Sequence, residues 1–163
     1  MHATHKLLLG LALFLPALCH AQAKCPWLTE PTARGVLGGP VKATVKLSEK
    51  HDGVCEFSRQ QGTVVLELRI SVEIMTDVPK QFATYLTQCP PKSTPLTAIG
   101  NEAVTCSVQE HADRYVEKVV SRVRDQAFVV TLSSSAQNDP SMSPGMRTEK
   151  TQLVAEQVAG ILF

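Results

Sequence analysis

The sequence lacks the motifs that usually identify an enzyme. It has no Cys-x-x-Cys pair, and no histidine stands at metal-ligand spacing from a cysteine, which argues against a redox dithiol or a zinc site. Gly35, Gly38 and Gly39 have the wrong spacing for a phosphate loop, and no Lys-Ser or Lys-Thr follows them. The serines at 133–135 lack the glycine context of a nucleophile elbow. We therefore predict no catalytic residues, no metal and no cofactor.

The sequence also lacks an excess of positive or negative charge. The chain has 16 basic and 15 acidic residues, and loss of residues 1–23 would remove only Lys6 from this count. Nucleic acids and anionic membranes are bound by clustered positive charge, so neither is expected as the main partner. After the N-terminal region no apolar run approaches the ~20 residues that span a bilayer, so we expect no membrane span in the mature chain.

What the sequence does have is an N-terminus with the three parts of a secretory signal. His2, His5 and Lys6 precede an apolar run over 7–18, and Ala21 and Ala23 provide the small residues before a cleavage site. We predict a signal peptide over 1–23 and a single α+β domain over 24–163, exported to the periplasm or secreted.

Two alternatives remain for this segment. A membrane anchor is disfavoured because the apolar run has about 12 residues, where a spanning helix needs ~20. Lipid attachment at Cys19 is disfavoured because Leu18 stands where a lipidation signal has a small residue.

Hydrophobic periodicity and turn residues divide 24–163 into helices and strands in the order α-β-β-β-α-β-β-β-α. This order favours an α+β fold, in which an antiparallel sheet carries helices on its apolar faces. Thr29 and Asp77 are expected to cap the first two helices, the second running to about residue 88, and Thr148 to cap the last. The expected strands are 41–47, 54–59, 64–74, 103–108, 115–123 and 127–133.

The strand over 64–74 has the clearest pattern. Every even position is apolar, whereas the odd positions include Glu67, Arg69 and Glu73. Period two predicts one face in the core and one in water. The three charged residues are expected to be paired on a wet sheet face; the rarer alternative is that they line a ligand groove.

Two segments without regular structure are expected in the second half. A proline-containing connector occupies 93–100, and a loop rich in Ser, Pro and Gly occupies 134–147, with Asn138 and Asp139 at its centre. The final helix should bury Val154, Val158, Ile161 and Leu162.

Four cysteines follow the predicted cleavage site, and they allow three disulfide pairings. We favour Cys25–Cys55, which would join the approach to the first helix to the second strand, and Cys89–Cys106, which would join the middle helix to the next strand. Such bridges are typical of proteins outside the reducing cytosol.

These features together resemble a known group. Cys25-Pro26-Trp27-Leu28-Thr29 precedes a short helix, Cys55-Glu56-Phe57 lies in a strand, and the run 96–103 reads Leu-Thr-Ala-Ile-Gly-Asn-Glu-Ala. The pattern is similar to that of small secreted or lipid-anchored bacterial domains of unknown function, with a PsbP-like α-β-α sandwich. The resemblance implies a bridge from the first cysteine to a strand and an envelope domain without catalysis. This chain departs from it in lacking a lipidation site and in carrying Cys89 and Cys106.

The remaining candidates are weak. His51 and His111 both fall in predicted turns beside aspartates, where a solvated turn is a better interpretation than a catalytic base. Trp27 is expected to pack on the disulfide of Cys25, with ligand binding as the alternative. The leading hypothesis is a non-catalytic module that binds or senses an envelope or secreted protein or a small ligand. The alternatives are an inhibitor of a secreted hydrolase that uses the 134–147 loop, and a small hydrolase.

Overall fold

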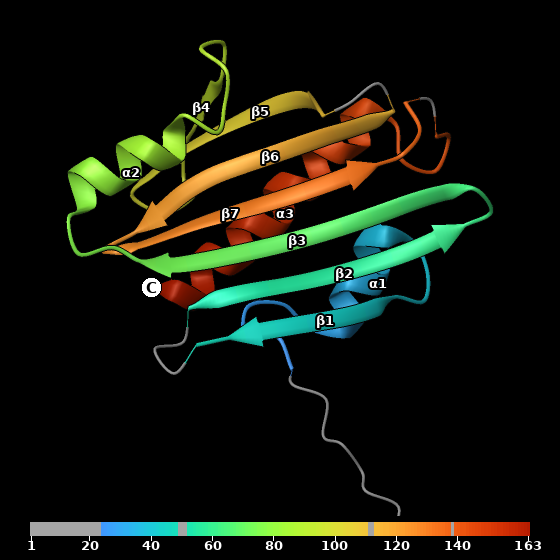
Figure 1. Cartoon of the computed structure of the whole chain (residues 1–163), viewed down its shortest axis with the longest axis horizontal. Helices are drawn as coiled ribbons and strands as arrows, with labels where there is room; N and C mark the ends of the chain where they lie inside the picture. The colour runs from blue at the N-terminus through green and yellow to red at the C-terminus, as the bar shows by residue number, and fades with distance from the viewer. Residues whose placement is uncertain (1–23, 49–51, 111–112, 138) are drawn as a thin grey trace, which may run out of the picture.

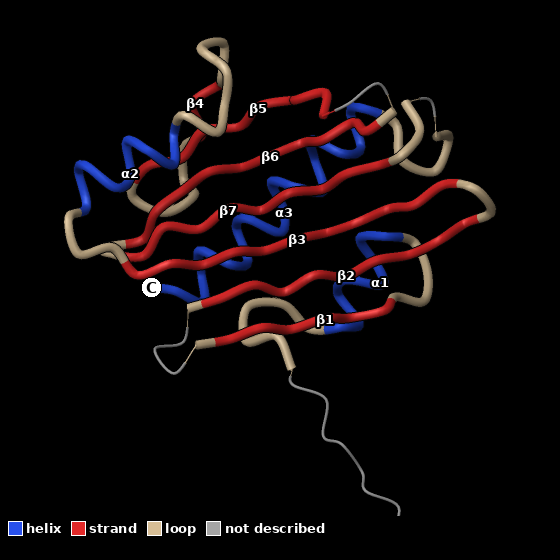
Figure 2. The backbone as a smooth tube through the Cα atoms, in the orientation of Figure 1, coloured by secondary structure: helices blue, strands red, loops and turns tan. Residues whose placement is uncertain are grey.

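In the described part of the chain, seven antiparallel strands form one sheet in the order β1-β2-β3-β7-β6-β5-β4 (Figures 1 and 2). The computed structural model describes residues 24–163 except 49–51, 111–112 and 138. The predicted signal peptide, His51, His111 and Asn138 therefore lie outside the described residues. The strands are β1 (Lys42–Leu47), β2 (Gly53–Gln61), β3 (Val64–Ile74), β4 (Thr94–Leu96), β5 (Glu102–Glu110), β6 (Arg114–Val123) and β7 (Gln126–Ser134).

Among the described residues, three helices pack on this sheet: α1 (Glu30–Leu37), α2 (Val78–Leu86) and α3 (Pro144–Leu162). Helices α1 and α3 lie behind the sheet in Figure 1, whereas α2 lies by β5 and β6. The predicted α+β class is confirmed, as is the predicted order of elements, with one addition. The connector expected over 93–100 contains the short strand β4, where Pro95 is tolerated because β4 is an edge of the sheet.

Strand β3 has the predicted bounds and the predicted alternation. Leu66, Leu68, Ile70 and Val72 are buried in the main core, to which α1 and α3 also contribute, while the odd positions face the other side. Its neighbours are β2 and β7, so β3 joins the first half of the sheet to the second. The main core therefore lies between β3, β7 and the two helices behind them.

The C-terminal end of α1 is held by cations from two other elements. Arg59 donates to the carbonyl oxygen of Leu37 at 2.6 Å, and Lys150 of α3 donates to that of Val36 at 2.6 Å. Gly38 ends the helix with a φ of 78°, which favours glycine. Burial, reinforced by the charge of Arg59, lowers the pKa of Lys150, although Glu149 opposes this shift.

A second, smaller core lies on the opposite face under α2. Phe82 packs there with Val120, Ala127 and Val129. These positions alternate with Val119, Phe128 and Val130, which belong to the main core, so α2 covers the other side of the same strands.

Both predicted disulfides are present. Cys25–Cys55 lies at the main core and Cys89–Cys106 at the smaller core, with sequence separations of 30 and 17 residues. Such bridges are typical of proteins outside the reducing cytosol. None of the helices in the described residues is long and apolar enough to cross a membrane.

Three expectations at the ends of elements are wrong. Helix α3 begins at Pro144 with Ser143 as its cap, because Ser-Pro is itself a strong helix start; Thr148 lies inside the helix. Helix α2 ends at Leu86, before residue 88. Ile161 is 55% exposed because it stands at the margin of the buried face of α3, whereas its neighbour Leu162 packs against the main core.

The corrected start of α3 can be tested by removing each hydroxyl. Ser143→Ala should lower the free energy of unfolding by about 1 kcal/mol, since the Ser143 side chain accepts from the N–H of Met146. Thr148→Ala should cost less than about 0.5 kcal/mol, because this partly exposed side chain only donates to a carbonyl within the helix. Urea unfolding monitored by circular dichroism measures both. A larger loss at Thr148 would contradict the observed cap.

Candidate functional site

A polar groove of about 840 Å³ lies on the face of the sheet opposite α1 and α3. We call it the sheet groove. Strands β3, β6 and β7 contribute to its floor, and Tyr85 and Gln88 line it from the side of α2. The charged lining residues are Asp52, Glu67, Arg69, Glu73, Glu110, Arg114 and Lys118.

The centre of the groove is a row of residues from adjacent strands. Arg69 of β3 pairs in register with Thr131 of β7, which pairs with Lys118 of β6. Directly paired residues of antiparallel strands point to the same face, so the three side chains stand side by side. Two cations therefore flank one hydroxyl, an arrangement we call the central row.

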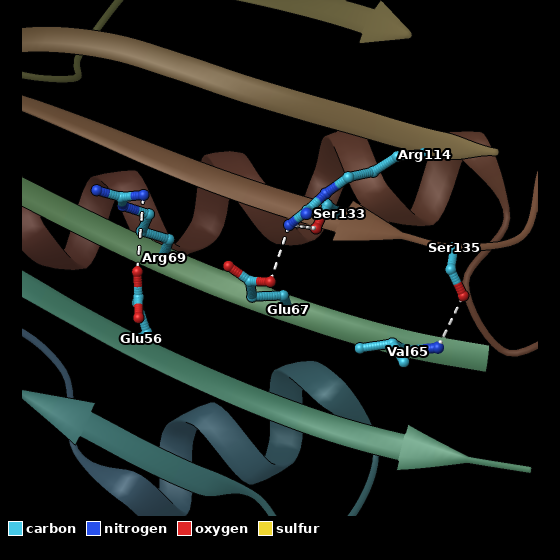
Figure 3. A network of polar contacts seen from close by, with 7 residues as sticks. All are labelled: Glu56, Val65, Glu67, Arg69, Arg114, Ser133 and Ser135. Atoms are coloured by element: carbon cyan, nitrogen blue, oxygen red, sulfur yellow. Dashed lines mark hydrogen bonds and ion pairs between the residues drawn. The ribbon is translucent and has the colours of Figure 1, made fainter. Parts of the chain in front are cut away.

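Each cation of the central row also has an acidic partner. Arg69 lies 3.6 Å from Glu56 of β2 (Figure 3), and Lys118 lies 3.6 Å from Glu110 of β5. The Arg69 side chain is 50% exposed and that of Lys118 is 13% exposed. Partly exposed pairs at this distance contribute little to stability, in the range of about 0–1 kcal/mol.

A tighter cluster lies one step further along the strands. Arg114 donates to Glu67 at 2.8 Å and to the hydroxyl of Ser133 at 3.2 Å (Figure 3). Beside it, Ser135 accepts from the backbone N–H of Val65 at 2.9 Å. The predicted pairing of charges on this face is thus observed for Glu67 and Arg69.

The end of the groove nearest α2 is acidic. The Tyr85 hydroxyl donates to Glu73, and Asp52 lines the same end. Burial raises the pKa of the Tyr85 phenol, and the hydrogen bond to Glu73 and the charge of Asp52 raise it further. Tyr85 therefore remains a neutral donor at physiological pH, and the negative charge of this end belongs to Glu73 and Asp52.

The structure brings together three of the residues singled out in the sequence: Glu67, Arg69 and Glu73 all line the sheet groove. Trp27 lies elsewhere, in the main core behind the sheet, and is 3% exposed. Its indole therefore packs in the interior rather than facing a ligand. Asp139 is 8% exposed and accepts from the N–H and the hydroxyl of Ser141.

Sequence reasoning missed the partners that complete the groove, namely Arg114, Lys118, Thr131 and Tyr85. Arg114, Lys118 and Thr131 come from β6 and β7, which are distant in sequence from β3, whereas Tyr85 comes from α2, the element that directly follows β3. The alternation of Arg114, Lys118 and Arg122 along β6 was the available signal. It was obscured because valines occupy both faces of that strand.

The side chains that line the sheet groove can bind a ligand through hydrogen bonds and ion pairs. Hydroxyls of Ser71, Thr131 and Ser133 stand among cations and carboxylates. Within the described ranges, no three Asp, Glu, Cys or His side chains are grouped closely enough to hold a metal ion.

Comparison with known protein families and with curated proteins found no relative of this chain. No protein-family model matches the chain, and no curated protein matches it significantly.

Proposed function

We propose that this chain is an exported domain, periplasmic or secreted, that binds a polar ligand or partner in the sheet groove without converting it chemically. An exported, non-catalytic role is also what the resemblance to small bacterial envelope domains implies. The single observation that carries the proposal is the groove itself. Its volume of about 840 Å³ falls in the ordinary range of ligand sites, and charges and hydroxyls from three strands converge on it.

Two further observations support binding through this face. The sheet carries α1 and α3 on one side, while α2 covers the strands of only one end on the other. The side chains left uncovered are polar and mostly ion-paired, so the face is stable in water as it stands. A ligand of complementary charge gains fixed partners there without needing the sheet to rearrange.

The loop before α3 supports the inhibitor alternative less well. Asp139 and Met142 are buried, and Arg147 donates to the carbonyl oxygen of Met142 at 2.8 Å. These contacts anchor the loop against the body of the protein. A loop that inserts into a hydrolase would instead present its central side chains outward.

The proposal is tested by filling the groove. Ser71 lies on its floor, and Ser71→Trp would place a large ring there from the side of β3 that faces away from the main core. Thr44→Trp is the matched control, since Thr44 is exposed on the same face of β1 but does not line the groove. Each protein is immobilised and exposed to envelope and culture-fluid fractions of its producing cell, and retained species are identified by mass spectrometry.

We expect the parent and Thr44→Trp to retain the same species and Ser71→Trp to lose it. Circular dichroism confirms that both variants are folded. A species retained equally by all three proteins would show that the groove is not the binding surface.

A further inference from the structure

The central row has an unused capacity for hydrogen bonding. Among the residues that the structure describes, the Thr131 hydroxyl has no hydrogen-bond partner, although it stands between Arg69 and Lys118. Neighbouring strands are ~4.8 Å apart, so the two cationic residues lie ~10 Å apart at the backbone. Long flexible side chains at this spacing can converge above the threonine.

The two cations are also less fully engaged than their neighbour Arg114. Arg114 donates at 2.8 Å to Glu67 and also reaches Ser133, whereas Arg69 and Lys118 each lie 3.6 Å from a single carboxylate. A guanidinium has five N–H donors and an ammonium has three. Donors therefore remain for an oxyanion placed over Thr131, where charge-assisted hydrogen bonds are strongest.

The opposite charge lies at the end of the same groove. Glu73 follows Arg69 by four residues on one face of β3, which corresponds to ~13 Å along the strand. Asp52 lines this end as well. An extended peptide spans at most ~3.3–3.6 Å per residue, so about four residues bridge this distance.

We propose that the sheet groove holds a short peptide-like zwitterion, with its carboxylate on the central row and its ammonium beside Glu73 and Asp52. This inference rests on the proposed function and names the ligand class for the same groove. A sugar fits less well, because Tyr85 is the one aromatic residue among the described residues that line the groove, and its hydroxyl is already bonded to Glu73.

The test uses four probes with the intact protein: tetraglycine, tetraglycine amide, N-acetyl-tetraglycine and inorganic phosphate. Binding is followed by isothermal titration calorimetry and by NMR shifts of the backbone amides. We expect tetraglycine to bind and to shift amides of β3, β6 and β7. Removal of either terminal charge should weaken binding about tenfold, the effect of losing one charge-assisted contact.

Variants identify which end binds where. Arg69→Gln and Thr131→Val should each weaken the binding of tetraglycine about tenfold. Neither change should alter the binding of tetraglycine amide, which is already weak because this probe has no carboxylate to contact the central row. Lys42→Gln, on the same face of β1 but outside the groove lining, is the control and should bind within twofold of the parent. Phosphate that competes with tetraglycine supports the assignment of the central row as an oxyanion subsite.

Three outcomes would overturn the inference. They are equal binding of tetraglycine and its amide, an unchanged affinity in Arg69→Gln, and binding of phosphate without binding of tetraglycine. If none of the probes binds while Ser71→Trp still loses a species that the parent retains, the peptide assignment is wrong and the proposed function stands. If Ser71→Trp loses nothing and no probe binds, both are wrong.

Discussion

Replacement of Leu68 by alanine is expected to lower the free energy of unfolding by about 2–5 kcal/mol. Leu68 is fully buried at the centre of β3, and β3 packs between β2 and β7 beneath the helices of the main core. Removing its branched side chain leaves a cavity that the flanking strands cannot close, because their register is fixed by pairing on both sides. Urea denaturation with both fluorescence and circular dichroism measures the loss.

Arg69→Ala is the matched control, one residue along on the opposite face. Its side chain is half exposed and its pair with Glu56 is loose, so the change should cost well under about 1 kcal/mol. Comparable losses at the two positions would contradict the division of β3 into a core face and a groove face.

Removal of the bridge at the main core should have an effect of similar size. Cys25→Ala combined with Cys55→Ala should lower the free energy of unfolding by roughly 3–4 kcal/mol, the loop-entropy value for a separation of 30 residues. Cys55 is fully buried, so lost packing adds to this. Thermal and urea unfolding of the oxidised parent and the double variant measure the difference.

The companion variant lacks Cys89 and Cys106. Its free energy of unfolding should fall by roughly 3 kcal/mol by the same loop-entropy argument. The region that loses stability should differ, because this bridge ties the end of α2 to β5. Hydrogen exchange should show lost protection mainly in α2 and little change in β3. Alkylation of the unreduced parent should label none of the four cysteines, and a peptide map joining Cys25 to Cys89 or to Cys106 would refute both assignments.

Much of the fold could be predicted because its strongest signals are local. Strand β3 was bounded correctly by strict alternation over Val64–Ile74, and the start of α1 was predicted correctly from its cap Thr29. The start of α3 was missed because Ser143, Pro144 and Gly145 share their composition with a loop. The Ser143-Pro144 helix start was therefore overlooked, although it acts together with packing that buries Met142 and Arg147.

The candidate site was less predictable for a different reason. Glu67, Arg69 and Glu73 follow from the period of one strand, but their partners follow from which strands are neighbours. The pairing of β3 with β7, and of β7 with β6, sets Lys118 beside Thr131 and Arg69. No local pattern encodes that adjacency, and Arg114, Lys118 and Thr131 were missed because of it.

The position of β3 in the sheet also has a consequence for the order in which the chain can fold. As the polypeptide emerges N-terminus first, α1 and the first three strands are complete long before β7 and α3, which lie beyond residue 125. Until then one edge of β3 has no partner, and the main core around Leu66, Leu68 and Ile70 lacks the side chains that β7 and α3 contribute to it. Unpaired edges and exposed apolar faces favour aggregation. The nascent chain therefore depends on chaperone protection or rapid completion, and loss of the last helix would leave a chain that aggregates rather than a smaller folded domain.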